Sequence, residues 1–192
     1  MRVYDENGRY IGSIRKKELI NAEEAVMPVA ITAFPAVLQR QKMTEKQIKA
    51  TECFNQKMHC SQSVLFAFAK ECGITEETAF RLGSCFGSGM RKGNVCGACT
   101  GALMVLGLMF GESHMGDGDE RRRSNRLNDE FLDRFAMANG TFICNDLLGC
   151  DVSTPEGAQY ARSNGLFKDF CPKMVESAVE ILEDMIAEQQ TE

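Results

Sequence analysis

The sequence predicts a mainly α-helical protein, an irregular helical bundle with a small N-terminal β-hairpin. Apolar residues recur at helical spacing along most of the chain after residue 43, as is typical of amphipathic helices that share one core. Glycine, proline and capping residues divide this pattern into successive segments. The first residues alternate instead as a strand pair does, around Asn7-Gly8. A helical domain preceded by an extension of different structure is therefore expected.

The extension begins with a weak alternation of apolar and polar side chains over residues 2–13. Asn7-Gly8 at its centre favours a two-residue hairpin turn, because both residues tolerate a positive φ. From 15 to 41 the spacing is helical, but Pro28 and Pro35 interrupt it and argue against one continuous helix. We expect a hairpin followed by short helices.

Capping signals mark the helices that follow. Thr44 and Gln47 have the spacing of a capping box, and Thr75 is a typical N-cap residue. Gly73 suits the position after a helix end, and Pro172 suits the first turn of a helix. We expect helices over 44–58, 60–72, 75–82, 97–110, 122–138, 143–148 and 172–187, with a glycine-rich loop over 83–93, a polar connection over 111–119 and a loop-like stretch over 149–169.

The chain is expected to form two parts. Residues 1–43 are the N-terminal extension and a candidate dimer arm, and residues 44–192 form a helical, cysteine-rich domain. With 44% hydrophobic and 26% charged residues, the composition is that of a globular protein. The length of 192 residues is enough for one domain with its own core.

Charge and hydropathy exclude several classes of partner. A net charge of −5 argues against nucleic acid, whose non-specific binding needs basic surface. The longest apolar stretch, 98–110, is too short to span a bilayer, so we expect no membrane partner. The first residues lack the apolar region of a secretory signal, and we expect a cytoplasmic protein.

Cysteine is the chief candidate for a reactive or metal-binding side chain, because the chain has nine cysteines, two histidines and no tryptophan. Cytoplasmic thiols are kept reduced, so this content favours metal binding or redox chemistry over structural disulfides. Four cysteines fall at or just before a predicted helix start, where free backbone N–H groups stabilise the thiolate that binds metal. These four are Cys60, Cys96, Cys144 and Cys171.

The spacing of Cys96 and Cys99 leaves a second interpretation open. A CxxC pair at a helix start is the arrangement of thiol–disulfide oxidoreductases, although no βαβ pattern of a thioredoxin-like fold surrounds this one. A zinc-stabilised module is a third interpretation, although a second closely spaced pair is missing. The roles of the other cysteines are not readable from sequence; they are Cys53, Cys72, Cys85 and Cys150.

The glycine-rich loop over 87–93 lacks the Gly-Lys-Ser/Thr ending of a phosphate-binding loop, which argues against a nucleotide. Its glycines suit close approach of the backbone to a bulky cofactor.

At these residues the chain resembles the redox-active proteins defined by a CGAxxG motif and four cysteines, the C_GCAxxG_C_C family. The resemblance rests on Cys60 in His-Cys-Ser-Gln, Cys96-Gly97-Ala98 with Gly101, Cys144 and Cys171, and it covers roughly residues 45–185. The family is also similar to the non-haem part of split-Soret cytochromes, which are dimeric and carry a [2Fe–2S] centre. The chain lacks CxxCH, so no haem is expected.

The resemblance implies a redox protein whose four cysteine thiolates ligate an iron–sulfur cluster, with [2Fe–2S] favoured over [4Fe–4S]. It also implies a homodimer and a redox partner protein, whose identity the sequence does not give. Electron transfer or redox sensing is the leading hypothesis, and the CxxC oxidoreductase and the zinc module remain as alternatives.

Overall fold

Two short strands are described near the N-terminus of this computed structural model, which describes residues 2–4, 10–13 and 42–191. Strand β1 (Arg2–Tyr4) pairs antiparallel with β2 (Tyr10–Ser13). The turn predicted at Asn7-Gly8 and the short helices predicted over 15–41 lie outside the described residues, so the hairpin as a whole stays a prediction. Contacts divide the chain into two units, Met1–Gln41 and Lys42–Glu192.

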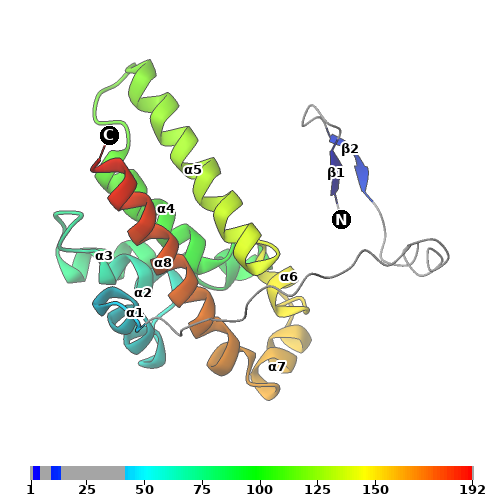
Figure 1. The fold of residues 1–192 in the computed structure, drawn as a ribbon. Coiled ribbons are helices and arrows are strands. Elements are labelled where there is room, and N and C mark those ends of the chain that lie inside the picture. The colour runs from blue at the N-terminus through cyan, green and yellow to red at the C-terminus, as the bar shows by residue number, and fades with distance from the viewer. Residues whose placement is uncertain (1, 5–9, 14–41, 192) are drawn as a thin grey trace, which may run out of the picture. The chain divides into compact units, whose positions relative to one another are not determined.

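The second unit is helical, as Figure 1 shows. Its elements are α1 (Glu45–Asn55), α2 (Cys60–Ala67), α3 (Glu76–Gly83), η2 (Gly89–Gly93), α4 (Gly97–Phe110), α5 (Gly118–Asn139), α6 (Cys144–Leu148), α7 (Pro155–Ser163), η3 (Leu166–Phe170) and α8 (Cys171–Gln189). None of the described helices combines the length and the hydropathy needed to cross a membrane.

The predicted capping box at the start of α1 is confirmed. The Thr44 side chain accepts a hydrogen bond from the Gln47 N–H at 3.1 Å, and the Gln47 side chain accepts one from the Thr44 N–H at 2.8 Å. Thr75 caps α3 through the Thr78 N–H, also as predicted. Each pair satisfies backbone donors that the first turn of a helix leaves free.

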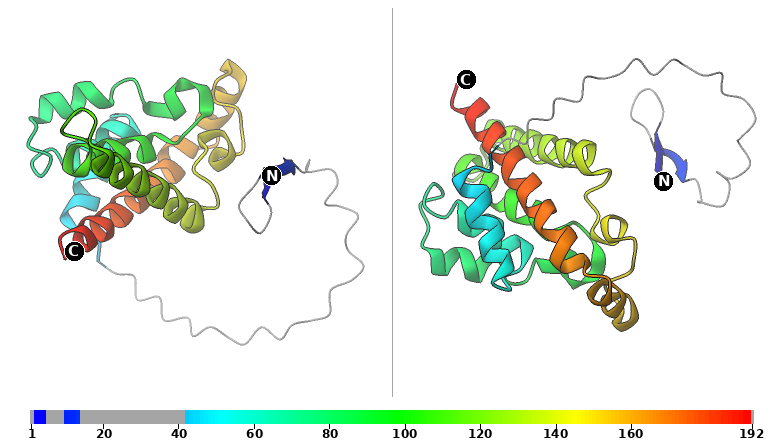
Figure 2. Two further views of the ribbon diagram at one scale, coloured as in Figure 1. Left: turned by 90° about the horizontal axis from the view of Figure 1, so that it is seen from above. Right: turned by 60° about the horizontal axis from the view of Figure 1, so that its bottom comes forward.

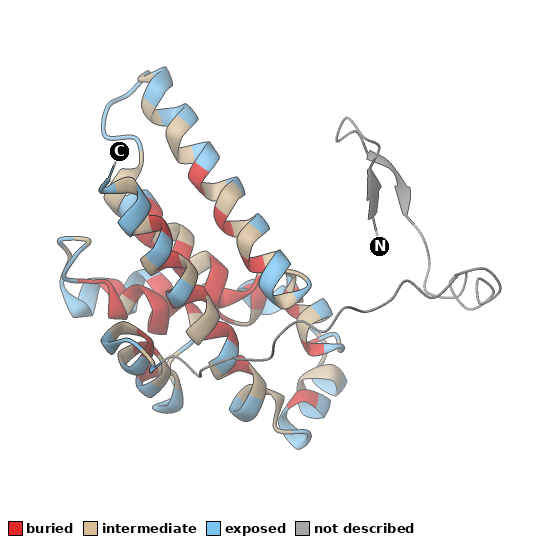
Figure 3. Ribbon diagram, in the orientation of Figure 1, coloured by how far each residue is buried: buried red, intermediate tan, exposed pale blue. Residues whose placement is uncertain are grey.

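Helices α2 and α4 form the centre of the second unit. Helix α2 packs against α1, α3 and α4, and α4 packs in addition against α5 and α8. Figure 2 shows α8 running beside α1, and Figure 3 shows the buried residues concentrated where α2, α4 and α8 meet. The core is built from small and branched side chains with three buried phenylalanines, Phe68, Phe131 and Phe135.

Helix α2 was expected over 60–72 but ends at Ala67.

Two further element predictions were wrong. The stretch 149–169 was expected to be loop-like, but it contains α7, whose first turn holds Pro155 and is capped by Thr154 through the Gly157 N–H at 3.1 Å. Helix α5 begins at Gly118, four residues before the expected start at 122, because Asp117 accepts hydrogen bonds from the N–H groups of residues 119 and 120. Both helices begin with polar turns, where apolar spacing gives no signal.

Candidate functional site: a pocket lined by four cysteines

Four helix starts converge on one small cavity of about 20 Å³, which we call the cysteine pocket. Cys60, Cys144 and Cys171 are the first residues of α2, α6 and α8, and Cys96 is the N-cap of α4. The structure therefore brings together all four cysteines that the sequence singled out, although they span more than a hundred residues of chain.

Backbone hydrogen bonds fix the relative positions of Cys96 and Cys144. Val95 and Ile143 form an isolated antiparallel bridge. Beside it the Cys96 N–H donates to the carbonyl of residue 142 at 2.8 Å, and the Cys144 N–H donates to the carbonyl of residue 94 at 2.7 Å. Because the bridge is antiparallel, the two segments run in opposite directions and the cysteines leave it at opposite ends, yet both line the same pocket.

Close packing of α2 against α4 places Cys60. A Cβ atom at Gly97 would lie 3.1 Å from the Cys60 Cβ, and one at Gly101 would lie 2.7 Å from the Ser61 carbonyl oxygen. Both glycines therefore face α2 and allow it to approach. Gln62 fixes the start of α2 by accepting from the His59 N–H at 2.9 Å and donating to the Phe80 carbonyl at 2.8 Å.

The thiols of the pocket differ in the direction in which their pKa values are shifted. The Cys99 thiol donates to the Cys96 sulfur, and the backbone N–H groups of residues 98 and 99 add to this, so the pKa of Cys96 is lowered despite burial. Cys60 donates to the Cys171 sulfur and is desolvated, which raises its pKa well above the ordinary value. Burial, followed by the neighbouring Cys96 and Cys171, raises the pKa of Cys144 to about 12. Cys96 therefore ionises more readily than Cys60 and Cys144.

The remaining wall of the pocket is apolar apart from one hydroxyl. It consists of Ser88, Leu147, Leu148, Phe167, Phe170 and Met174. Ser88 and Phe167 have open space on their other side, because they also line two neighbouring cavities of about 170 Å³ and about 130 Å³. Sequence analysis did not find these wall residues, because they come from α6, η3, α8 and the residue before η2 and meet only in the folded chain.

Ser88 belongs to a run of four consecutive residues in the left-handed region, with φ between 52° and 58° from Ser88 to Arg91. This conformation costs about 1–2 kcal/mol for each residue other than glycine. The turn is held where the Asn94 N–H donates to the Gly89 carbonyl at 3.1 Å. Strain of this kind accumulates at functional sites, and here it lies on the wall of the cysteine pocket.

The donor set and the walls fit a sulfur-ligated metal group. Four thiols face one space, and cysteine thiolates are the usual ligands of iron–sulfur clusters. The free volume corresponds to about one water molecule, so a bound group needs outward movement of a wall side chain such as Phe167. Within residues 42–191, no three His, Cys, Asp or Glu side chains are arranged as a ready-made site for a metal ion.

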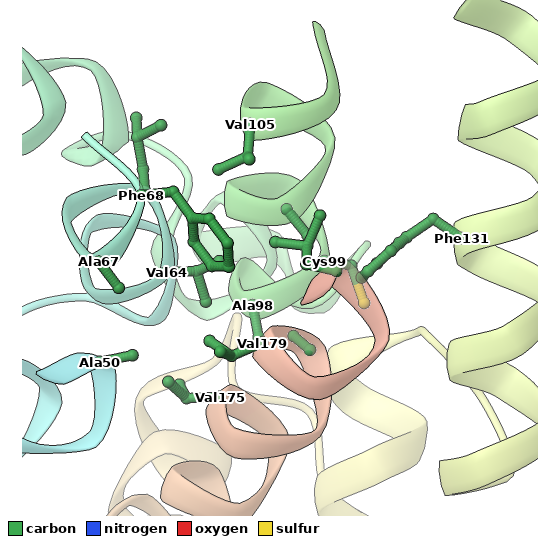
Figure 4. Packing of buried hydrophobic residues seen from close by; sticks show 14 of the residues in the cluster. Ala50, Val64, Ala67, Phe68, Ala98, Cys99, Val105, Phe131, Val175 and Val179 are labelled. Carbon is green, nitrogen blue, oxygen red and sulfur yellow. The ribbon is translucent and has the colours of Figure 1, made fainter. Parts of the chain in front are cut away.

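The other cysteines lie outside the cysteine pocket. Cys99 is fully buried in the core, and Figure 4 shows it between Val64, Val105 and Phe131. Burial and the neighbouring Cys96 raise the pKa of Cys99 far above its ordinary value. Cys53 is buried in α1, Cys72 and Cys150 are half-buried, and Cys85 is exposed.

Comparison with known proteins agrees with the sequence motif. Residues 58–185 match the family model described as "Putative redox-active protein (C_GCAxxG_C_C)", and the match contains all four cysteines of the pocket. No curated protein and no solved structure matches the chain. The homodimer and the redox partner protein implied by the resemblance stay predictions. Because the match covers about two thirds of its residues, the chain belongs to the C_GCAxxG_C_C family of redox-active proteins.

Proposed function

We propose that the protein is an electron-transfer or redox-sensing protein that holds an iron–sulfur cluster through Cys60, Cys96, Cys144 and Cys171. The observation that carries the proposal is the meeting of four helix-start cysteines in one pocket with apolar walls. A cluster, when bound, accepts and releases electrons at a potential set by hydrogen bonds and exposure. Four thiolates suit [2Fe–2S] and [4Fe–4S] alike, and the resemblance favours [2Fe–2S].

The chain's own residues prepare the pocket for such a group. Cys96 has a lowered pKa and supplies the first thiolate. Leu147, Phe170 and Met174 exclude water, which protects iron–thiolate bonds and lowers the local dielectric constant. The backbone N–H groups at the start of α4 point toward negative charge on sulfur.

The proposal predicts a pH dependence of cofactor uptake. Cys60 and Cys144 have raised pKa values and are protonated at neutral pH, so ligation must release their protons. Uptake of iron and sulfide by the reduced apoprotein should therefore strengthen as the pH rises from about 6 to about 8. Proton release on reconstitution, measured in weak buffer, checks this; no release would contradict ligation by these two thiols.

The test of the function itself is anaerobic purification or reconstitution, followed by visible absorption, electron paramagnetic resonance of the dithionite-reduced protein, and iron and sulfide analysis. Ligation predicts charge-transfer bands that are lost in a Cys144→Ser variant and kept in Cys85→Ser, a matched change at an exposed cysteine outside the pocket. Stoichiometric zinc without visible bands would favour the zinc module.

One observation supports the alternative function, a CxxC thiol–disulfide oxidoreductase. The Cys99 thiol lowers the pKa of Cys96, as a second cysteine does in dithiol enzymes. However, Cys99 is fully buried and strongly disfavoured as a thiolate, so it is poorly placed to resolve a mixed disulfide. Insulin reduction by metal-free protein would favour the enzyme.

A further inference from the structure

We propose that a second site, beside the cysteine pocket, binds the anionic group of a small organic acid between Arg91 and Arg162. The cavity between these arginines, here the arginine cavity, measures about 130 Å³ and is lined by Ser88, Arg91, Val152, Ala158, Arg162 and Phe167. A single water needs about 10–15 Å³ by the same kind of measure, so the cavity accepts a group of several atoms.

The charge of this cavity suits an anion. Two guanidinium groups line it, and no carboxylate is among its lining residues. In the described part of the chain, neither Arg91 nor Arg162 has a side-chain ion pair, whereas Arg121 and Arg134 pair with glutamates. Guanidinium groups recognise carboxylate and phosphate through paired N–H donors, and a bound anion would provide the missing countercharge.

The backbone adds an independent observation. Arg91 occupies the left-handed region with φ 58° and ψ 17°, in the strained turn that begins at Ser88. Arginine has no intrinsic preference for this conformation, and such strain is typical of ligand-holding segments. The turn brings Arg91 to the same cavity as Arg162, which comes from α7.

The shape of the neighbouring space indicates an organic ligand. A cavity of about 170 Å³, here the Cys60 cavity, is lined by Phe54, Met58, His59, Cys60, Ser88 and Phe167. It shares Ser88 and Phe167 with the arginine cavity, so the two spaces adjoin. A ligand with its acid group between the arginines can place an aromatic or short aliphatic part against Phe54 and Met58, next to Cys60. Cys60 is the least buried of the four pocket cysteines.

Benzoate is the first probe and benzamide its neutral isostere, with binding to the purified full chain followed by calorimetry. We expect benzoate to bind with a Kd on the order of 1 mM and benzamide at least about tenfold more weakly, because the arginines select charge. Arg91→Gln and Arg162→Gln should each weaken benzoate binding by about fivefold or more. Lys92→Gln and Lys168→Gln are matched changes at nearby cations that do not line the cavity. They should leave the Kd for benzoate within about twofold of the wild-type value.

Inorganic phosphate and phenyl phosphate form the second arm and separate a phosphate site from a carboxylate site. Met58→Trp fills the Cys60 cavity and should weaken the binding of benzoate and phenyl phosphate but not that of inorganic phosphate. Met137→Trp, the matched change at a residue with 87% exposure, should leave the binding of all three unchanged. No anion binding, or equal binding by the arginine variants, overturns the proposal. Unchanged benzoate binding by Met58→Trp overturns its extension to Cys60. None of these readouts depends on a cluster, so their failure leaves the proposed function standing.

Discussion

At the scale of single residues, Cys96 and Cys99 lie one turn apart at the start of α4 in opposite surroundings. Cys96 lines the cysteine pocket and has a lowered pKa, while Cys99 is enclosed by the core. Under the proposed function, this separation means that the CxxC sequence supplies one cluster ligand instead of two. Cys99 still affects the pocket, because its thiol donates to the Cys96 sulfur.

Replacing these two cysteines separately should give unequal results. Cys96→Ser should abolish or markedly shift the visible bands, because a ligand is lost. Cys99→Ala should keep them, although removal of the thiol donor should shift the reduction potential. Absorption spectra and a redox titration check both variants. Dithiol activity in metal-free wild-type protein that both variants lose equally would contradict cluster binding and favour the oxidoreductase.

Gly101 allows α2 and α4 to pack closely, and a methyl group there should be costly. A Cβ would lie 2.7 Å from the Ser61 carbonyl oxygen and 3.1 Å from the Val64 Cβ. We expect Gly101→Ala to lower the free energy of unfolding by about 1–3 kcal/mol, measured by urea denaturation. Gly107→Ala, on the same helix with no atom within 4 Å of its Cβ position, should instead raise it by about 0.5–1 kcal/mol. An unchanged free energy of unfolding in Gly101→Ala would refute the close-packing role of this glycine.

At the scale of elements, α7 shows how a helix can depend on its cap. Its exposed, polar sequence buries one residue, Ala161, so tertiary packing contributes little to it. The Thr154 side chain accepts a hydrogen bond from the Gly157 N–H at the helix start. Pro155 occupies the first turn, where a backbone N–H would have no partner within the helix, so its missing N–H costs nothing.

Removing this cap should loosen α7 and the arginine cavity with it. Thr154→Ala should cost about 1 kcal/mol of stability and lower the hydrogen-exchange protection of residues 158–163, while Thr154→Ser should retain both. Benzoate affinity should fall in the alanine variant, since α7 carries Arg162. Unchanged exchange would show that packing, not the cap, holds α7.

The helices were predictable from sequence where apolar spacing and capping agreed. Helix α4 was expected over 97–110 and is found there, and the caps at Thr44 and Thr75 are also as expected. Helix α7 was missed because its N-terminal signal, Thr154-Pro155, is not followed by an apolar stripe. The left-handed turn at Ser88–Arg91 had no signal beyond the glycines of its loop, because serine, methionine and arginine do not favour that backbone.

At the scale of the whole molecule, burial of thiols couples stability to pH. The pKa of Cys72 is raised to about 11 and that of Cys144 to about 12, mainly by burial, against about 8.5 in an unfolded chain. A raised thiol pKa contributes stability below pH 8.5, which is lost as the unfolded chain ionises first.

The free energy of unfolding of the reduced, metal-free protein should therefore fall between about pH 8 and about pH 11. Urea titrations at several pH values check this. A Cys72→Ala variant should show a shallower fall, whereas Cys85→Ala, at an exposed thiol, should match the wild type. An equal slope in the Cys72 variant would show that other groups cause the loss.

The convergence of the four cysteines could be foreseen because each carries the same local mark, a position at a helix start. Their role as ligands stays a prediction until a cofactor is measured. The surroundings could not be foreseen. Arg91 and Arg162 lie 71 positions apart, and no periodic pattern connects an irregular turn to a helix that begins with polar residues.

The meeting of four distant helix starts also has a consequence for biosynthesis. The three segments between successive pocket cysteines are closed into loops as soon as one group joins the sulfurs, and this closure reduces the entropy of the unfolded chain. The last of these loops ends at Cys171, so the set cannot be completed until the ribosome has released residue 171. A cluster would therefore be fully ligated only late in synthesis. Its loss would remove the cross-link from all three segments at once.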